Sequence, residues 1–409
     1  MSTIDLDVLI GACSAGGPSA LSSVTQLRPA DGPQAAIAPA KYAAARGDSG
    51  TYVYGRRYFE GEAQRCVLID SAQSQRNRAE LALALAIEDG NPVLGLVPRI
   101  RVTYTREEST ESFTDLELPH RAFDAHIRAG TVDGKPTTQH PAYRAARDSS
   151  PANAWALFNL SPASLVFGSW DATRKAHQGR WPSAITGEIL GVLADQASSD
   201  GEPLKKGGAR VDPVGMSMRF DGETLKTLVE DQQTDMSPKT LKKVLNDANE
   251  ALKKRTVASA SSLGLGGIPP TLKQLGGVSC KSITRAHVLS FATLRQVRFG
   301  RGAEGDAALR AVLAAIAING MVRSDSELYI RASCHLVEDG PSQTILDRRH
   351  GNHEAVVLPE IEEADSLLEA ALTKATQVTG LQWNGQVFEV KGNPLILTSA
   401  PDESDEANS

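Results

Sequence analysis

A chain of 409 residues can hold one large domain with insertions or two to three ordinary domains. Its 41% hydrophobic and 22% charged residues are typical of a globular protein, and no apolar run approaches the 18 or so residues of a membrane helix. The N-terminal residues lack the basic segment of a signal peptide. Four widely spaced cysteines form no C-x-x-C pair, so reduced thiols in a cytoplasmic protein are expected rather than a zinc site.

Charge is divided unevenly along the chain, whose formal net charge is −6. Residues 1–303 hold 36 basic and 31 acidic residues, whereas residues 304–409 hold 7 and 18. The stretch 251–303 contains nine Lys and Arg and no Asp or Glu. Unopposed positive charge of this kind predicts a polyanion ligand, usually a nucleic acid, and a solvated basic face without a ligand is the alternative.

Strands and helices alternate irregularly in the sequence, which predicts an α+β fold. In chain order we expect a strand at 64–70, a helix at 77–88, strands at 99–104 and 164–170, a helix at 307–319 that ends at Gly320, a strand at 327–337, a helix at 360–379, and a tight hairpin turn at Asn384–Gly385.

The middle of the chain has the composition of an insertion. Residues 197–208 and 259–270 are rich in Gly, Ser and Pro, as linkers are. Between them, Ser237 and Pro238 have the residue types of a helix start. The apolar stripe predicted for this helix is Leu241, Val244, Leu245, Ala248 and Leu252, and the lysines Lys242, Lys243, Lys253 and Lys254 lie largely outside it.

Residues suited to catalysis or metal binding are sparse. The glycine-rich segment 11–18 lacks the spacing of known phosphate loops, and Cys13 has no obvious His partner. His350 and His353 have no Cys or carboxylate companion at ligand spacing. The sequence therefore predicts no metal, no cofactor and no catalytic residue.

Two further clusters suggest nucleic-acid binding. Ser71–Arg78 gathers hydroxyl, amide and guanidinium groups at a strand-to-helix junction, where free helix N–H groups attract phosphate. Residues 167–182 interleave Trp170 and Trp181 with Arg174, Lys175 and Arg180, a pattern suited to base stacking. A capping turn and two core tryptophans are the structural alternatives.

Five segments in this order resemble the backbone subunit of type I-U (I-G) CRISPR effector complexes (Cascade), a family of the RAMP superfamily. They are Leu68–Glu80, Leu118–Arg121, Leu165–Asp171, Arg210–Gly215 and Gly267–Pro270. The resemblance extends from about Leu27 to about Val337. It implies an RRM-like (ferredoxin-like) palm with inserted helical fingers and a hairpin thumb. The expected parts are a palm at 1–196 and 271–340, an insertion at 197–270, and an acidic C-terminal helix, hairpin and disordered tail at 341–409.

The resemblance also implies a role in antiviral defence. Copies of such a subunit assemble head to tail as a helical filament along one CRISPR RNA (crRNA), pair it with target DNA, join the large and repeat-end subunits, and leave cleavage to a recruited helicase–nuclease. No membrane partner is implied, and the subunit itself is not an enzyme.

The expected RNA contacts are Arg28, Lys41, Ser71, Gln73, Ser74, Gln75, Arg76, Asn77, Arg78, Arg121, Trp170, Arg174, Lys175, Arg180, Arg210, Lys273, Lys281 and Arg285. The expected finger or target-strand contacts are Lys242, Lys243, Lys253, Lys254 and Arg255. Two other classes stay open. One is a RAMP endoribonuclease, for which His120 beside Arg121 and Asp124 is the position to test, and the other is a small-molecule enzyme with an unrecognised site.

Overall fold

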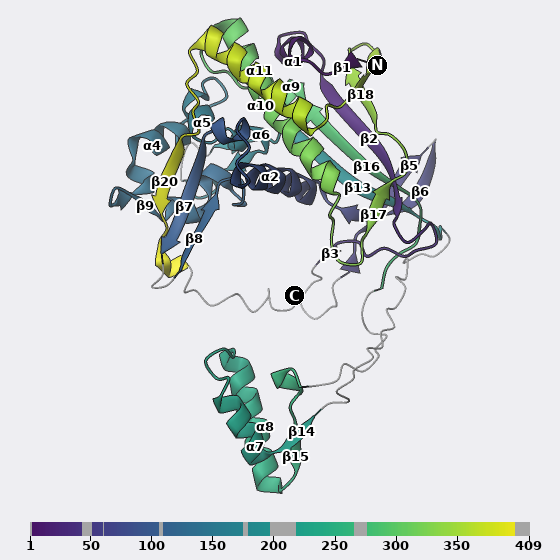
Figure 1. Cartoon of the computed structure of the whole chain (residues 1–409). Coiled ribbons are helices and arrows are strands. Elements are labelled where there is room, and N and C mark those ends of the chain that lie inside the picture. The colour runs from purple at the N-terminus through teal and green to yellow at the C-terminus, as the bar shows by residue number, and fades with distance from the viewer. Residues whose placement is uncertain are drawn as a thin grey trace. The chain divides into compact units, whose positions relative to one another are not determined.

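The chain divides into two compact units (Figure 1). Unit 1 comprises Met1–Gly201 and Val278–Ser409, and unit 2 comprises Glu202–Gly277, close to the expected insertion at 197–270. The computed structural model describes residues 2–42, 51–59, 61–105, 109–174, 179–196, 218–265 and 276–396.

A nine-stranded sheet forms the centre of unit 1 in the described residues. In spatial order its strands are β1 (Ser2–Thr3), β19 (His353–Val357), β18 (Gln343–Asp347), β2 (Ala20–Pro29), β16 (Cys280–Ser290), β13 (Ile185–Leu193), β6 (Glu62–Asp70) and β5 (Tyr54–Phe59), with β17 (Leu336–Glu338) also pairing with β2. Neighbouring strands are antiparallel except β1 and β19. Burial alternates along β2 and β16, so one face of the sheet meets the core.

Six elements of unit 1 give the ferredoxin-like order. In the chain they are β2, α2 (Ala72–Glu88), β13, β16, α10 (Gly302–Glu327) and β18, a β-α-β-β-α-β sequence. In the sheet the four strands lie in the order β18-β2-β16-β13, so the last strand lies beside the first. Unit 2 is inserted between the hairpin strands β13 and β16. The predicted α+β palm is therefore confirmed.

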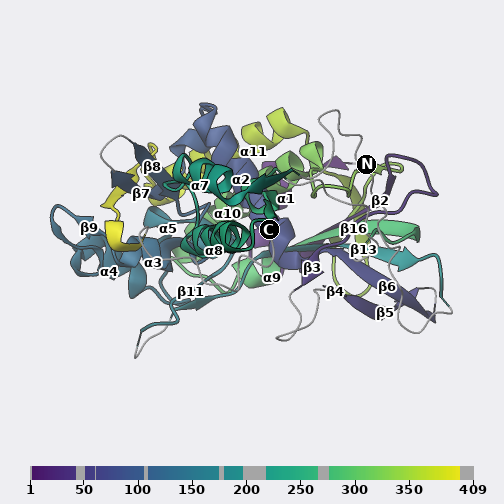
Figure 2. The same ribbon diagram turned by 90° about the horizontal axis from the view of Figure 1, so that it is seen from below.

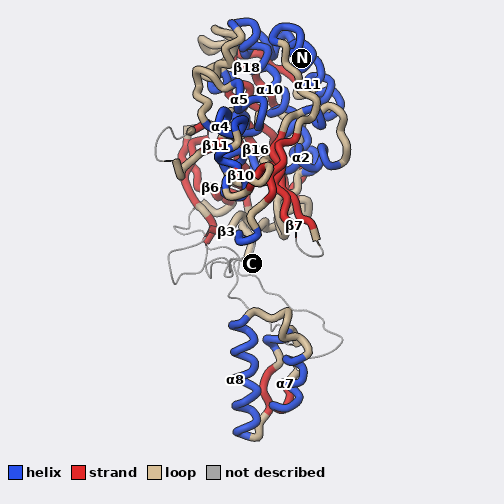
Figure 3. Tube along the Cα trace, turned by 90° about the vertical axis from the view of Figure 1, so that its left-hand side faces the viewer, coloured by secondary structure: helices blue, strands red, loops and turns tan. Residues whose placement is uncertain are grey.

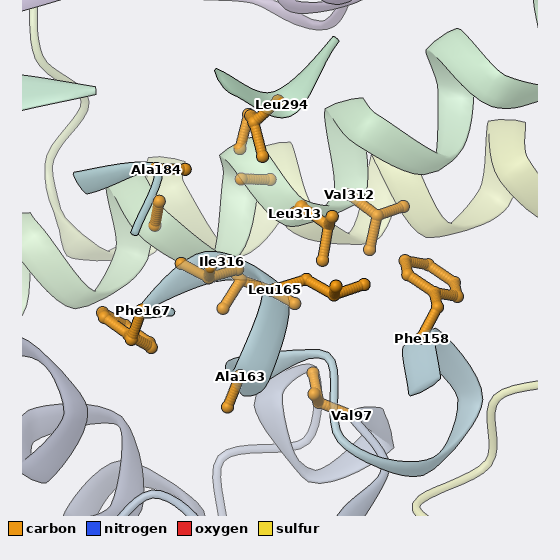
Figure 4. Close-up of a cluster of buried hydrophobic side chains, with 14 of the residues drawn as sticks. Val97, Phe158, Ala163, Leu165, Phe167, Ala184, Leu294, Val312, Leu313 and Ile316 are labelled. Atoms are coloured by element: carbon orange, nitrogen blue, oxygen red, sulfur yellow. The ribbon is translucent and has the colours of Figure 1, made fainter. Parts of the chain in front are cut away.

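The described part of unit 1 contains nine helices. They are α1 (Leu6–Cys13), α2, α3 (Ala125–Arg128), α4 (Pro141–Arg147), α5 (Trp155–Leu160), α6 (Ala163–Val166), α9 (Phe291–Leu294), α10 and α11 (Ile361–Thr379). Helix α10 contacts α1, α2 and α11, and every residue of it from Gly305 to Met321 is buried. Figure 4 shows Val312, Leu313 and Ile316 of α10 facing Leu165 of α6. A helix that is apolar all round is a core helix.

Helix α10 is also long and apolar enough to cross a membrane. The most apolar 18-residue window of this helix is, however, entirely buried inside the protein. Length and composition alone are weak evidence for a membrane span when a core helix has the same properties.

Smaller sheets and short turns complete unit 1. The second sheet has the order β10 (Lys135–Pro136), β9 (Thr131–Val132), β20 (Val387–Lys391), β7 (Arg99–Thr105) and β8 (Thr110–Thr114). Two-stranded ribbons are formed by β3 (Lys41–Tyr42) with β4 (Thr51–Tyr52) and by β11 (Ser169–Trp170) with β12 (Arg180–Trp181). The short 3-10 turns are Leu94–Leu96, Arg121–Phe123, Thr137–Gln139 and Pro394–Ile396.

Unit 2 is a small α+β module with its own core. A ribbon of β14 (Arg219–Asp221) and β15 (Val257–Ser259) flanks α7 (Gly222–Glu230) and α8 (Pro238–Lys254), as Figure 3 shows, and a 3-10 turn follows at Ser261–Leu263. Its central apolar cluster consists of the buried residues Leu225, Val229, Val244, Ala248 and Ala260. Ser237 caps α8 by accepting a hydrogen bond from Thr240 N at 3.2 Å, so the predicted start of this helix is confirmed.

Two apolar runs form other structures than predicted. The strand expected at 164–170 is wrong, because residues 163–166 form α6 and only Ser169–Trp170 are extended. This run is buried on all sides, so it lacks the alternation that distinguishes a strand from a helix. The strand expected at 327–337 is also wrong. Helix α10 continues to Glu327, Leu328 caps it with φ +43°, and only Leu336–Glu338 joins the sheet.

Two glycines have other roles than those predicted. Gly320 does not end α10, and a Cβ on it would lie 3.2 Å from the Ala79 carbonyl oxygen of α2, so it permits close helix packing. Gly385 has φ +81° but does not join two paired strands, because β20 pairs with β7 in parallel. The expected C-terminal helix is α11, which packs on α10 inside unit 1 and does not form a separate region.

Candidate nucleic-acid interface

The cluster at 71–78 forms the first two turns of α2. Ser71 caps the helix by accepting a hydrogen bond from Ser74 N at 3.2 Å. The helix begins at Ala72, five residues before the predicted start, so the cluster lies on the helix itself. Gln73 and Asn77 are exposed, whereas Gln75 is buried. The exposed side chains therefore lie beside the positive end of a 17-residue helix.

The side chains of Gln75 and Arg78 are hydrogen-bonded to a buried carboxylate at the end of β6. Asp70 accepts hydrogen bonds from Gln75 Nε2 at 2.6 Å and from Arg78 Nε at 3.1 Å, and it also pairs with Arg331. Burial alone would raise the pKa of Asp70, but the hydrogen bonds from Arg78 and Gln75 hold it below its ordinary value.

Arg78 further anchors the segment that follows α10. It donates to the backbone oxygens of Tyr329 and Ile330, each at 2.6 Å. Its side chain is 22% exposed. We therefore assign Arg78 a supporting role, in which it fixes the 328–331 segment to α2.

A second buried network joins three of the segments that carry the family resemblance. Arg121 binds both carboxylate oxygens of Glu80 in α2 and donates to the backbone oxygen of Gly168 at 2.8 Å. Burial raises the pKa of Glu80 to about 7, although the charge of Arg121 opposes the rise. Arg121 is only 8% exposed, so its contacts hold α2 and Gly168 together inside the protein.

Near this pair lies the buried carboxyl of Asp115. Asp115 accepts hydrogen bonds from Ser161 Oγ and from Ile100 N at 3.1 Å. Burial raises the pKa of Asp115 to about 6. No basic side chain lies within ion-pair distance of it in the described part of unit 1. These contacts join the segment after β8 to β7 and to the segment that leads to Gly168.

Arg76 differs from its neighbours because its side chain makes no hydrogen bond or ion pair with the described residues. Burial lowers the pKa of this half-buried guanidinium, and the nearby positive charge of Arg121 lowers it further. A cation that is held partly out of water beside a helix N-terminus, without a carboxylate of its own, is suited to bind an anion.

The ribbon of β11 and β12 presents an aromatic ring next to Arg121. Trp170 is 43% exposed and pairs across the ribbon with Arg180, whose guanidinium lies 4.7 Å from the centre of the indole. Trp181 is only 6% exposed and its indole N–H has no partner among the described residues, so it belongs to the core. One of the two tryptophans is therefore available for stacking. The other is not.

Arg174 and its neighbour Asp171 are tied to α4. Arg174 donates to the backbone oxygen of Arg147 at 3.0 Å and pairs with Asp148. Arg147 in turn binds the buried Asp171. The start of the loop between β11 and β12 is thus held by two ion pairs. Lys175, Arg210 and Lys273 lie outside the described residues.

The remaining predicted contacts in unit 1 lie on strands: Arg28 on β2, Lys281 on β16, and Lys41 on the β3–β4 ribbon, where the preceding Ala40 N donates to Ile69 O at 3.1 Å. Arg28 on β2 is exposed and lies 3.5 Å from Asp339. Lys41 and Lys281 are exposed at the ends of β3 and β16.

Arg285 faces the opposite way, into the core of unit 1. It is 1% exposed and lies 2.7 Å from Glu338 and 3.2 Å from Asp325. Arg285 was expected to contact RNA, but its guanidinium instead forms ion pairs within the protein.

In unit 2 the basic residues of α8 are all at the surface. Lys242, Lys243, Lys253, Lys254 and Arg255 are exposed, and Lys254 pairs with Glu250 one helical turn away at 2.8 Å. The side of α8 that faces the core is formed by Val244, Ala248 and Ala251. The predicted separation of an apolar stripe from a basic face is present, except that Leu252 is 37% exposed and Ala251 is buried instead.

The described residues show no arrangement suited to metal binding or to nucleophilic catalysis. No group of three His, Cys, Asp or Glu that could hold a metal occurs among the described residues. Asp124 uses its carboxylate to bind the backbone N–H groups of His120 and His126, so it does not orient the imidazole of His120. Burial raises the pKa of Cys13 to about 12, which makes this thiol unreactive.

A groove of about 620 Å³ lies outside α2, lined by residues that include Leu81, Leu85, Arg323 and Tyr329. Its Arg323 is paired with Asp365 at 2.7 Å. The serines of the groove, Ser324 and Ser326, donate their hydroxyls to backbone oxygens of α10 and not to a base, so the alternative of a small-molecule enzyme gains no support from it.

Comparison with known proteins gives one match. Residues 21–196 match the family of the CRISPR-associated protein GSU0053, while no curated protein matches the chain. The matched residues are fewer than half of the chain and run from β2 to the end of β13, so they include Glu80, Arg121 and Gly168. This match supports a CRISPR-associated protein with a part in CRISPR defence.

Proposed function

We propose that the chain is the crRNA-binding backbone subunit of a type I-U (I-G) Cascade complex. Copies of it polymerise head to tail along the guide RNA and support recognition of target DNA. The family match over residues 21–196 supports the link to CRISPR defence. The ferredoxin-like palm, with unit 2 inserted between β13 and β16, agrees with the fold that the resemblance implies.

The observation that carries the proposal is the surface formed by Arg76, Trp170 and Arg180. Arg121 connects its two halves, because it binds Gly168 O two residues before Trp170 and its charge acts on Arg76. A phosphate would bind Arg76 at the N-terminal end of α2, and an unpaired base would stack on Trp170. A strand that lies across both elements would therefore meet a cation on α2 and an aromatic ring on the β11–β12 ribbon.

The proposal implies a set of partners and excludes catalysis by this chain. The partners are crRNA, further copies of the chain, target DNA, the large and repeat-end subunits, and a recruited helicase–nuclease, all in the cytoplasm. We propose no cofactor and no nuclease activity. The endoribonuclease alternative is not favoured, because Asp124 is committed to backbone hydrogen bonds and Arg121 to Glu80.

Co-expression with a crRNA tests the proposal. The purified protein should elute from size exclusion as an RNA-bound multimer with a high ratio of absorbance at 260 to 280 nm, and the RNA should dissociate as salt rises. The double variant Arg76→Ala, Trp170→Ala should lose RNA, whereas Lys374→Ala on α11 should not. A monomer free of RNA in the presence of the guide would refute the proposed function.

A further inference from the structure

The hairpin of β5 and β6 forms one edge of the main sheet (Figure 2). Its register pairs Tyr54 with Val67, Arg56 with Arg65 and Tyr58 with Ala63. Because side chains alternate along a strand, these three pairs share one face of the hairpin. The face therefore carries a tyrosine, an arginine and a tyrosine along β5, with a second arginine opposite the first.

This face is exposed at Arg56 and Tyr58, whereas Tyr54 is half-buried and Val67 is buried, and its charge is not balanced. Tyr58 is 80% exposed, and Arg56 beside it is also exposed. Arg65 is half-buried, and it donates to the Asp195 backbone oxygen at 3.5 Å. No carboxylate lies within ion-pair distance of Arg56 or Arg65 among the described residues. Like charges directly opposite each other destabilise a strand pair, so the arrangement costs stability in the free protein.

The other face of the same hairpin is balanced. Arg57 points to that side and pairs with Glu188 of β13 at 3.2 Å. Glu62, opposite Phe59, lies on that face as well. The hairpin thus neutralises the cation on one face and leaves two cations without acids on the face with Tyr58.

We propose that this face, defined by Tyr54, Arg56, Tyr58 and Arg65, is a second binding site for single-stranded nucleic acid. A base stacks on the ring of Tyr58, and phosphates on either side of it bind Arg56 and Arg65. Alternate residues on a strand lie about 6.6 Å apart, so a base and the adjacent phosphate can be bound by successive side chains of β5. The strand bound is the guide RNA or an unpaired strand of target DNA.

Charge and ring together favour a nucleic acid over an acidic peptide. Carboxylates could neutralise Arg56 and Arg65 but would leave the 80% exposed Tyr58 in water. This second site depends on the proposed function in one respect, namely that the chain binds nucleic acid. It lies on β5 and β6, whereas the first site lies on α2 and the β11–β12 ribbon.

Binding of labelled single-stranded RNA, single-stranded DNA and duplex DNA of equal length to the full chain tests the site. Tyr58→Ala should weaken single-strand binding about 5- to 100-fold, as loss of one stacked base does, and Tyr58→Phe should retain it. Arg56→Ala should reduce the slope of log affinity against log salt by about 0.7. Arg57→Ala is the matched control, since it removes the same charge from the opposite face and should bind like the wild type.

The outcomes separate this site from the proposed function. Loss of RNA binding alone identifies the guide as the strand bound, and loss of DNA binding alone identifies the target. If Arg76→Ala weakens binding while Tyr58→Ala and Arg56→Ala do not, the hairpin proposal is overturned and the function stands. If these hairpin variants keep their affinity but lose the multimer, the face contacts protein and the proposal is equally overturned. A wild-type chain that binds no strand refutes both.

Discussion

Replacing Arg76 and Arg78 by alanine one at a time separates RNA contact from structural support. The two residues lie two positions apart on α2, but α2 turns by about 100° per residue, so they point in different directions. Arg78 donates to Asp70 at 3.1 Å and to two backbone oxygens at 2.6 Å. Arg76 has no such bond.

The expected magnitudes follow from these contacts. Hydrogen bonds to charged groups contribute about 1.5–3 kcal/mol each, but water reaches the partly exposed Arg78 and Asp70 keeps two other donors. We therefore expect Arg78→Ala to cost about 3 kcal/mol in the free energy of unfolding. Over the roughly 330 residues of unit 1, that loss lowers the Tm by about 4 °C.

Arg76→Ala should leave the free energy of unfolding within about 0.5 kcal/mol of the wild type, as expected for a surface site. It should weaken RNA binding about 10-fold or more, almost equally for guides of different sequence, because a phosphate contact carries no sequence information. Thermal melts and RNA titrations on both variants provide the test. The reasoning fails if Arg76→Ala melts early, or if Arg78→Ala retains its Tm and loses RNA.

Three further outcomes are expected. Trp170→Ala should weaken RNA binding by about 1–3 kcal/mol with little change in Tm, because the ring is exposed. Trp181→Ala should instead lower the free energy of unfolding by about 3–5 kcal/mol, because that ring is buried. Equal effects of the two variants in thermal melts and RNA titrations would contradict these assignments. Burial raises the pKa of Asp115 from 3.8 to about 6, so the native state binds this proton more tightly and stability should fall as pH rises from about 4 to 6. In Asp115→Asn that component of the Tm profile should be absent, and an unchanged profile would assign the slope to other groups. Charge reversal at Lys253 and Lys254 should leave the melt of the chain nearly unchanged but lower its affinity for nucleic acid, and full retention of affinity would make the α8 surface a bare solvent face.

The spacing of apolar residues in the sequence identified those strands and helices that have one buried face and one solvent-exposed face. The strand at 99–104 alternates in burial as its sequence does, and the helix at 360–379 ends at Gly380 as predicted. Where every residue of a segment is buried, as at 163–166, apolar and polar residues do not alternate, so the sequence does not distinguish a helix from a strand. The expected strand at 327–337 failed for a related reason, because whether an apolar segment joins a sheet depends on a partner strand distant in the chain.

The candidate site was predictable only in its location. The basic cluster at 71–78 and the exposed Trp170 were found from residue types alone. That Arg121 and Arg285 point inward could not be found in this way, since it depends on acids 41 and 53 residues away, the buried Glu80 and the partly exposed Glu338. A charge is expected at the surface unless its partner is known.

The same physics explains why segments typical of a family need not be made of contact residues. A buried ion must meet a partner at fixed geometry, so Asp70, Glu80 and Arg121 constrain both residue type and spacing. A phosphate contact requires only a cation near the surface, and its position along the chain is less constrained. On α2 the helical phase then separates the two roles, with Gln75 and Glu80 turned inward and Arg76 left without a hydrogen-bond or ion-pair partner in the described part of the chain. Mutation of the inward residues should therefore reduce RNA binding only through loss of fold, whereas mutation of Arg76 should reduce it directly.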